Sequence, residues 1–325
     1  MIFKVSYLTE KVNEYINSLA YNHAPNELYN PIDYVLEVGG KRVRPLLMLL
    51  AYNLYKDDIE SVLPQAAAIE MYHNHTLLHD DLMDNSDMRR NRPTVHKVWD
   101  ENTAILSGDT MLILAYKYMC ECDKDFLDRI LPLFTITAIE ICEGQQWDIQ
   151  FETMEDVTID QYIEMIRLKT AVLLAASLKI GAIKAGASDE DADSLYQFGI
   201  NLGLAFQLQD DYLDVYGTPE TFGKSIGNDI ISNKKTFMLL SAYNNGSEQQ
   251  KAEILRWVKM DNFDPQDKIK AITAIYNELN IDKLCFEKID NYFEKGLVLL
   301  DSIGVEESKK SELKDFVKRM MRRNV

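Results

Sequence analysis

The sequence is poor in the residues that interrupt helices or cross-link a chain. Its 325 residues include only 14 Gly, 8 Pro and 4 Cys. Gly and Pro lie below their usual frequencies of roughly 7% and 5%, which favours long helices over many tight turns. Four cysteines are too few for a disulfide scaffold in a chain of this length. We therefore expect a reduced, cytoplasmic protein.

Long apolar runs and basic side chains are also scarce. No uninterrupted apolar stretch reaches the roughly 18 residues of a membrane-spanning helix. Charges interrupt the first segment, MIFKVSYLTEKVNEYINS, so we expect neither a signal peptide nor a membrane span. Lys and Arg number 35 against 52 Asp and Glu, which gives a net charge of −17. That charge argues against a nucleic-acid partner, because phosphate backbones would be repelled.

Helical periodicity is what the chain has in abundance. Hydrophobic residues make up 46% of it, enough for a large core. Helices are predicted over Pro45–Tyr55, from Pro64 onward, and over 104–121, 128–150, 159–185, 189–216 and 233–243, with more in the C-terminal third. No β-type alternation and no linker stands out. We expect an all-α fold of about ten or more helices in a single domain, residues 1–325, with helices 104–121 and 190–216 at its centre.

The acidic motif D-D-x-x-D occurs twice, as Asp80, Asp81 and Asp84 and again as Asp210, Asp211 and Asp214. In a helix, positions i and i+4 share a face and i+1 lies beside them. Like charges at this spacing repel one another, so they need a cation or full solvation. Clustered carboxylates suit Mg²⁺, which also takes waters and phosphate oxygens as ligands. The alternative for each motif is an acidic, solvated helix face.

Basic residues gather in a few places despite the negative charge. The clusters are GGKRVRP at 39–45, RRNRPT at 89–94, Lys169-Thr170, Lys224 and Lys234-Lys235-Thr236. Arg binds phosphate through two parallel hydrogen bonds and Lys acts as a point charge. Each cluster alone could instead lie on the surface or cap a helix. Together with two acidic motifs, the clusters predict a site for two phosphorylated ligands.

These motifs, in this order and spacing, resemble the trans-isoprenyl diphosphate synthases, or polyprenyl synthetases, of the short-chain farnesyl/geranylgeranyl type. The segments that carry the resemblance are GGKRVRP, HNHTLLHDDLMDNSDMRRNRPTVH, LSGD, LKT, FQLQDDYLD and FGKSIGNDIISNKKT. They span roughly residues 35–240. Asn91 and Asn233 stand where the family usually has Gly.

The resemblance implies a fold, a reaction and a cofactor. The fold is an isoprenoid-synthase-type bundle of helices around a central cavity. The enzyme joins isopentenyl diphosphate head-to-tail to an allylic diphosphate (dimethylallyl, geranyl or farnesyl) and releases pyrophosphate. Three Mg²⁺ ions bind with the allylic diphosphate, and the enzyme is a homodimer. No dedicated protein base is required, because released pyrophosphate accepts the proton.

The resemblance also implies roles for individual residues. The Mg²⁺ ligands are Asp80, Asp84 and Asp210, with Asp81, Asp211 and Asp214 as further ligands or supports, and these six aspartates, Lys169 and Lys224 form the catalytic set. The residues that steady the allylic diphosphate are Arg89, Lys169, Thr170, Gln207, Lys224 and Lys234. The pocket for isopentenyl diphosphate contains Lys41, Arg44, His73 and Arg90. Without the resemblance, His73 would equally suit a packed position within an apolar helix.

The length of the product is expected to depend on the helix that precedes Asp80. Thr76, His75 and Tyr72 lie four, five and eight positions before that residue and face or flank the path of the growing chain. In the family, a bulky residue five before the first Asp tends to stop growth early. His75 therefore favours a C15 or C20 product, and Tyr72 supplies a second stop. A medium- or long-chain synthase remains an alternative.

Two further alternatives belong to other classes. A class I terpene cyclase also carries D-D-x-x-D, but it usually has a different second metal motif and does not need GGKRVRP. A non-catalytic subunit of a synthase would be expected to lose one acidic motif or the paired Arg89 and Arg90, and this chain retains them.

Overall fold

The computed structural model describes residues 1–19, 21, 23–218 and 226–322. The chain divides into two compact units. Unit 1 comprises Met1–Thr135, Ala176–Leu195 and Gly304–Leu313, and unit 2 comprises Ile136–Ala175, Tyr196–Ile303 and Lys314–Val325. Organisation as a single domain of residues 1–325 stays a prediction.

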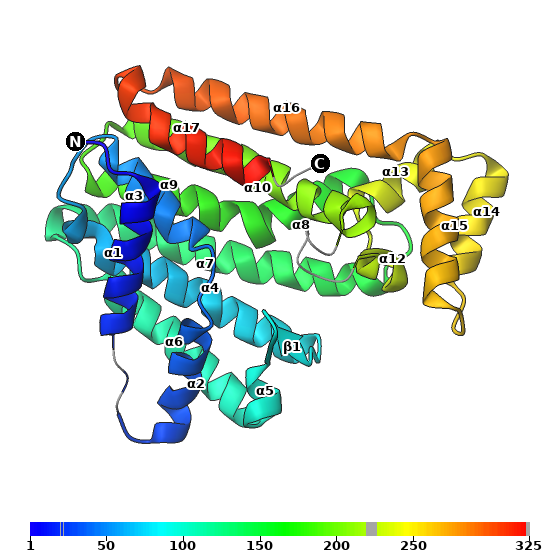
Figure 1. The fold of residues 1–325 in the computed structure, drawn as a ribbon, viewed down its shortest axis with the longest axis horizontal. Helices are drawn as coiled ribbons and strands as arrows, with labels where there is room; N and C mark the ends of the chain where they lie inside the picture. Colours follow the sequence, from blue (N-terminus) through cyan, green and yellow to red (C-terminus); the bar gives the residue numbers. More distant parts are fainter. Residues whose placement is uncertain (20, 22, 219–225, 323–325) are drawn as a thin grey trace. The chain divides into compact units, whose positions relative to one another are not determined.

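The elements follow one another along the chain as Figure 1 labels them. Those of unit 1 are α1 (Val5–Ser18), α2 (Asn26–Glu37), α3 (Val43–Asn53), the 3₁₀ helix η1 (Ile59–Val62), α4 (Leu63–Met83), β1 (Met88–Arg89), β2 (Arg92–Pro93), α5 (Val95–Val98) and α6 (Glu101–Met119). Four helices have parts in both units: α7 (Lys124–Thr153), α9 (Val172–Lys184), α10 (Asp189–Tyr216) and α17 (Glu307–Met321). Unit 2 also contains α8 (Ile159–Ile166), the π-helical turn η2 (Arg167–Ala171), α12 (Asn228–Ile231), α13 (Phe237–Asn245), α14 (Glu248–Val258), α15 (Pro265–Glu278) and α16 (Ile281–Ser302).

Helix starts coincide with the capping residues that the sequence offers. The side chain of Asp100 accepts from Thr103 N at the start of α6, and Asp264 caps α15 just before Pro265. Thr158 forms a capping box with Gln161 at the start of α8. Each such contact satisfies a backbone N–H that has no partner inside the helix, so these residues fix where the helices begin.

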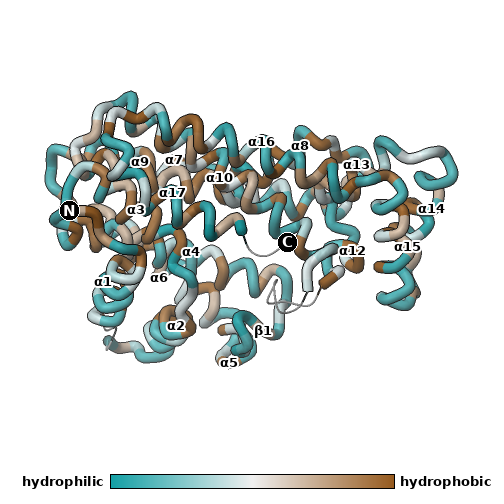
Figure 2. Tube along the Cα trace, turned by 45° about the horizontal axis from the view of Figure 1, so that its top comes forward, coloured by the Kyte–Doolittle hydropathy of each residue, from teal (hydrophilic) through white to brown (hydrophobic). Residues whose placement is uncertain are grey.

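The core of unit 1 forms around α4, which contacts α1, α3 and α6. Met48 and its neighbours from Leu46 to Ala51 are buried along α3. Close packing against α9 requires a glycine there, because a Cβ on Gly181 would lie 2.3 Å from the carbonyl oxygen of Met48. In Figure 2 the apolar runs of α3 and α9 appear as brown lengths of tube.

The core of unit 2 includes apolar residues of α10, among them Phe198, Leu202 and Leu208. The prediction that 104–121 would form a central helix is wrong for one side of α6. Leu106 and Ile113 are 58% and 68% exposed in the single chain. An apolar residue within a helix therefore did not guarantee burial, and α6 has an apolar outer edge.

The all-α prediction is confirmed, since the described residues contain only a two-stranded hairpin beside the helices. The hairpin pairs Met88 with Pro93 and Arg89 with Arg92. Asn91 in its turn has φ +62°, a left-handed conformation that Asn adopts more readily than other residues with a Cβ. None of the helices described is long and apolar enough to cross a membrane.

Candidate active site

The first acidic motif lies at the C-terminal end of α4, and its carboxylates differ in exposure. Asp81 is 5% exposed, whereas Asp80 is half-buried and Asp84 is exposed. Arg89 Nε donates to both carboxylate oxygens of Asp81, at 2.7 and 2.8 Å. Burial raises the pKa of Asp81, and the charge of Arg89 opposes that rise. Asp81 is thus engaged by the protein, while Asp80 and Asp84 reach the solvent.

Arg44 and His73 lie together in unit 1, as the sequence predicted for a common pocket. Arg44 Nη1 is 3.1 Å from His73 Nε2. A guanidinium can only donate, so the ring accepts at Nε2 and is neutral. Burial, followed by the charges of Arg44 and Arg90, lowers the pKa of His73 well below its usual value. The histidine therefore stays uncharged at neutral pH.

Arg90 lies against the glycine pair of the GGKRVRP segment. Its Nη1 donates to the carbonyl oxygen of Gly39. A Cβ on Gly40 would lie only 2.8 Å from Arg90 Nη1, so the guanidinium packs directly on the glycine backbone. Lys41 is exposed beside it. The structure thus brings together three of the residues predicted for the isopentenyl diphosphate pocket, Arg44, His73 and Arg90, and Lys41 follows Gly40 directly in the chain.

The predicted chain-length residues lie on α4 among aromatic rings. Tyr72 is buried, with its ring centroid 5.3 Å from that of Phe134 and 5.6 Å from that of His75. His75 Nδ1 lies 2.9 Å from the carbonyl oxygen of Gly108. Burial lowers the pKa of His75 to about 4, so the neutral ring donates to that carbonyl. Thr76 is half-buried, and its hydroxyl donates to the carbonyl of His73.

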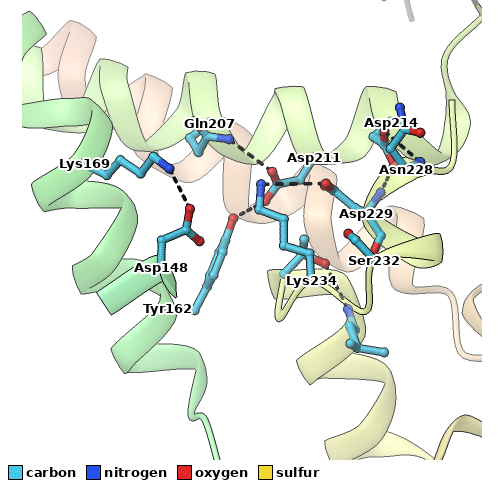
Figure 3. Close-up of polar contacts among 12 residues, drawn as sticks. Asp148, Tyr162, Lys169, Gln207, Asp211, Asp214, Asn228, Asp229, Ser232 and Lys234 are labelled. Atoms are coloured by element: carbon cyan, nitrogen blue, oxygen red, sulfur yellow. Dashed lines mark hydrogen bonds and ion pairs between the residues drawn. The ribbon is translucent and has the colours of Figure 1, made fainter. Parts of the chain in front are cut away.

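In unit 2, Asp211 of the second acidic motif is buried and receives two hydrogen bonds from neighbouring side chains (Figure 3). The hydroxyl of Tyr162 donates to one carboxylate oxygen, and Gln207 Nε2 donates to the other at 3.1 Å. Burial raises the pKa of Asp211 from its usual 3.8 to about 7, assisted by the charge of Asp229 and opposed by Lys234.

Asp214 is also buried, against the first residues of α12. Its carboxylate accepts from the backbone N–H groups of Asn228 and Asp229, at 3.2 and 3.0 Å. Burial, with the nearby charge of Asp229, raises the pKa of Asp214 to about 6. Asp210 is half-buried, so the second motif also combines buried carboxylates with a more accessible one.

Lys234 stands among these carboxylates. Its Nζ lies 3.7 Å from Asp229 Oδ1, as Figure 3 shows. Burial opposes a charge on Lys234, but the carboxylates of Asp211 and Asp229 outweigh it and raise the pKa of the lysine. Lys234 is therefore protonated at any pH near neutrality and offsets part of the negative charge.

Lys169 and Thr170 lie on the π-helical turn η2, a local widening that often marks functional sites. Lys169 Nζ donates to Asp148 Oδ2 at 2.6 Å, and Thr170 Oγ1 donates to Gln207 Oε1 at 3.0 Å. A Cβ on Gly144 would lie 2.4 Å from the backbone nitrogen of Lys169, so this turn packs against α7 only because a glycine is there. Lys224 lies outside the described residues.

Asn233 explains one departure from the family pattern and one error in a predicted boundary. Its φ is +59°, so α13 begins at Phe237 and not at Asn233 as the sequence suggested. Lys268 Nζ donates to Asn233 Oδ1 at 2.6 Å, and Asn233 Nδ2 donates to the carbonyl of Val258 at 3.1 Å. The side chain that a glycine would lack thus anchors the segment just before Lys234.

Sequence reasoning missed four carboxylate or hydroxyl groups that contact predicted site residues or neighbour them: Asp148, Tyr162, Asp229 and Glu70. Asp229 lies within the quoted segment FGKSIGNDIISNKKT but received no role. Glu70 carried a usable signal, because a single carboxylate in the apolar run AAAIEMY needs a buried partner. Nothing in the sequence marked Tyr162 or Asp148, whose partners come from other helices.

The donor set fits Mg²⁺ that arrives together with a phosphorylated ligand. In the part of the chain that the structure describes, no three His, Cys, Asp or Glu side chains are gathered as a self-sufficient metal site. Mg²⁺ commonly binds one or two carboxylates and completes its octahedron with water and phosphate oxygens. The more accessible carboxylates of Asp80, Asp84 and Asp210 suit that arrangement, since they reach solvent without unfolding the protein.

Comparison with known proteins agrees with the resemblance. Residues 25–276 match the polyprenyl synthetase family. A short chain isoprenyl diphosphate synthase of Methanocaldococcus jannaschii is 40% identical over 276 residues, 85% of this chain and 83% of that protein. A geranylgeranyl diphosphate synthase of Methanosarcina mazei is 40% identical over 249 residues, 76% of each chain.

A solved structure is similar over almost the whole length. The crystal structure of a geranylgeranyl pyrophosphate synthase superposes with a TM-score of 0.94 at 40% identity and covers 98% of this chain and 99% of that one. The family match spans well over half of the chain, and the relatives are named as prenyl diphosphate synthases. The resemblance and the enzyme class predicted from the sequence are confirmed: the chain belongs to the polyprenyl synthetase family.

Proposed function

We propose that the protein condenses isopentenyl diphosphate head-to-tail with an allylic diphosphate and makes a short-chain all-trans prenyl diphosphate of C15–C20. The observation that carries the proposal is the division of the acidic motifs. Asp81, Asp211 and Asp214 are buried and held by protein donors, whereas Asp80, Asp84 and Asp210 are accessible. Two acidic motifs that each keep some carboxylates open to solvent suit metal-bridged diphosphate binding.

The accessible carboxylates Asp80, Asp84 and Asp210 would hold Mg²⁺, and we propose that three ions bind. When bound, the ions neutralise charge that develops on the departing pyrophosphate. Lys234, Lys169 and Arg89 add positive charge for the same diphosphate and are already oriented by Asp229, Asp148 and Asp81. Preformed positive groups of this kind need no rearrangement when the allylic C–O bond breaks.

The second substrate, isopentenyl diphosphate, is assigned to the pocket of Lys41, Arg44, His73 and Arg90. Its double bond attacks the allylic carbocation, the new C–C bond forms, and a proton is lost to the released pyrophosphate. His73 does not compete with pyrophosphate for that proton, because its low pKa makes the neutral ring a weak base. The reaction requires that water be excluded, which apolar helices achieve.

The relatives support the short-chain assignment, since two of them are named as geranylgeranyl synthases. We further propose that the enzyme acts in the cytoplasm as a homodimer built from one polyprenyl synthetase domain, residues 1–325. The outer edge of α6 supports the dimer, because Ile105, Leu106 and Ile113 lie on it and are all exposed in the single chain.

Product analysis tests the reaction directly. With Mg²⁺, isopentenyl diphosphate and a C5, C10 or C15 allylic diphosphate, the purified protein should yield a C15 or C20 product that disappears with chelator.

Asp80→Ala and Asp210→Ala should each lower kcat by about 10³-fold or more, because stabilisation of the leaving group is lost. Asp261→Ala, an exposed site in unit 2, serves as the control. Cyclic hydrocarbons, or diphosphate binding without turnover, would contradict the assignment.

A second prediction concerns how the free energy of unfolding of the metal-free protein, kept in a chelator, depends on pH. Asp211 has a folded-state pKa of about 7 against 3.8 unfolded, so the folded state binds more protons between these values. The free energy of unfolding should therefore be highest below pH 4 with respect to this group and fall by roughly 1–4 kcal/mol as the pH rises to about 8.

Urea unfolding at several pH values measures this slope. Asp211→Asn should flatten it, whereas Asp261→Asn at an exposed position should leave it unchanged. A slope that is the same in Asp211→Asn and the parent protein would show that the carboxylate does not titrate in this range.

Chain length is tested at the aromatic cluster of α4. His75→Ala removes a ring that contacts Tyr72 and donates to Gly108, so space opens beside the expected path of the chain. Chromatography of the prenyl alcohols should show products longer than those of the parent enzyme. His79→Gln is the control at a neighbouring position, because His79 lies one turn nearer Asp80, is half-buried and contacts the same ring edge-on. An unchanged product distribution in His75→Ala would place the stop elsewhere.

The dimer is tested by adding a charge to the outer edge of α6. Ile113→Lys should shift the protein from the mass of two chains to the mass of one in light scattering coupled to gel filtration, because a desolvated ammonium opposes association. Val298→Lys on α16 is the control, since Val298 is 67% exposed and Ile113 68%. A parent protein that elutes as one chain, or an Ile113→Lys variant that remains paired, would count against this interface.

A further inference from the structure

A buried ion pair lies beneath the basic pocket of unit 1. Arg42 and Glu70 have side chains only 3% exposed, and Arg42 Nη1 is 2.6 Å from Glu70 Oε1. Arg42 also donates from Nη2 to the carbonyl of Leu36 at 3.0 Å and from Nε to Asn13 Oδ1 at 3.2 Å. Asn74 Nδ2 donates to the carbonyl of Glu70 at 2.8 Å and lies 3.3 Å from its Oε1. The guanidinium is thus bonded through all three of its nitrogens.

The backbone at Arg42 is in a conformation that needs such an anchor. Its φ is +49°, in the left-handed region that residues with a Cβ rarely adopt. It is also the N-cap residue, immediately before α3 begins at Val43. The guanidinium contacts Glu70 on α4, the carbonyl of Leu36 on α2 and Asn13 on α1. These contacts hold the backbone of the loop at 39–42 in its left-handed turn.

The same loop and the start of α3 carry groups that form the basic pocket. Lys41 precedes Arg42, and Arg44 follows it by two residues and bonds to His73. His73 lies between Glu70 and Asn74 on α4, about one turn from the buried carboxylate. Gly39 accepts a hydrogen bond from Arg90. The anchor therefore connects the loop to the helix that presents His73.

Glu70 also balances charge. The positive charges of Arg42, Arg44, Arg89 and Arg90 all act on His73. The carboxylate of Glu70 attracts Arg90 as well as Arg42, whereas Arg42 and Arg89 repel Arg90. A buried carboxylate beneath several arginines lets them converge before any diphosphate binds.

We propose that Arg42 and Glu70 form a positioning pair: they hold the loop 39–42 and the start of α3 on α4 and thereby set the geometry of the pocket for the diphosphate of the isopentenyl substrate. Neither residue touches the substrate. Their effect passes through Lys41, Arg44, His73 and Arg90. This inference rests on the proposed function and adds to it two residues to which the family resemblance gave no role.

The test separates the two substrates. Glu70→Gln keeps the size of the side chain and removes its charge, and Arg42→Lys keeps the charge and loses the planar fork. Each should raise KM for isopentenyl diphosphate by about tenfold to hundredfold, with KM for the allylic diphosphate within about twofold. Glu70→Gln leaves the buried guanidinium without its charge partner, and a lysine at 42 cannot keep all three hydrogen bonds of the arginine. Arg129→Met, which breaks the exposed pair with Asp189 in unit 1, is the control and should change neither constant.

Asn13→Leu provides a milder variant in case the buried pair is needed for folding. Asn13 is half-buried and contacts only the Nε of Arg42 among the groups of the pair, so we expect a rise of about two- to fivefold in KM for isopentenyl diphosphate alone. An unchanged KM, or an equal rise for both substrates, in the folded variants would overturn the proposal. A parent protein without condensing activity would instead refute the proposed function, so the two failures are distinguishable.

Discussion

Like charges held close together in surroundings with little water are the constraint that the charged cluster of each unit must satisfy. In unit 1 the arginines at 42, 44, 89 and 90 act on one histidine, and in unit 2 the carboxylates of Asp211, Asp214 and Asp229 lie near one another. Such groups cost folding energy unless each has a partner. Glu70, Asp81 and Lys234 supply opposite charge, while Tyr162, Gln207 and backbone N–H groups supply hydrogen bonds.

The helices provide this arrangement at their ends. The last turns of α4 and α10 carry the acidic motifs, and a helix end gives some side chains access to the core and others to solvent. In α4 the spacing alone explains the outcome, because Asp80 and Asp84 share a face and Asp81 points to another. In α10 it does not. Asp214 shares a face with Asp210 but is buried, and the backbone N–H groups of Asn228 and Asp229 donate to its carboxylate.

This division has a functional consequence. The buried carboxylates fix the cations and backbone around them through their hydrogen bonds. The accessible carboxylates are too few in any one described place to hold an ion alone, so metal and diphosphate are expected to bind together. The protein then offers the substrate a preorganised set of charges, which favours the separation of an allylic cation from pyrophosphate.

The sequence by itself determined the helical fold, both acidic motifs, the basic clusters and the family, because these depend on periodicity, spacing and residue type. Through the resemblance it also assigned Arg44 and His73 to one pocket, and the contact between them is seen in the structure. The tertiary structure decided the rest. It alone showed that Asp214 is buried, that Tyr162 and Asp148 hold Asp211 and Lys169, and that α6 exposes an apolar edge. Contacts between helices distant in sequence carry no local pattern, so only the folded chain could reveal which partner each charge has.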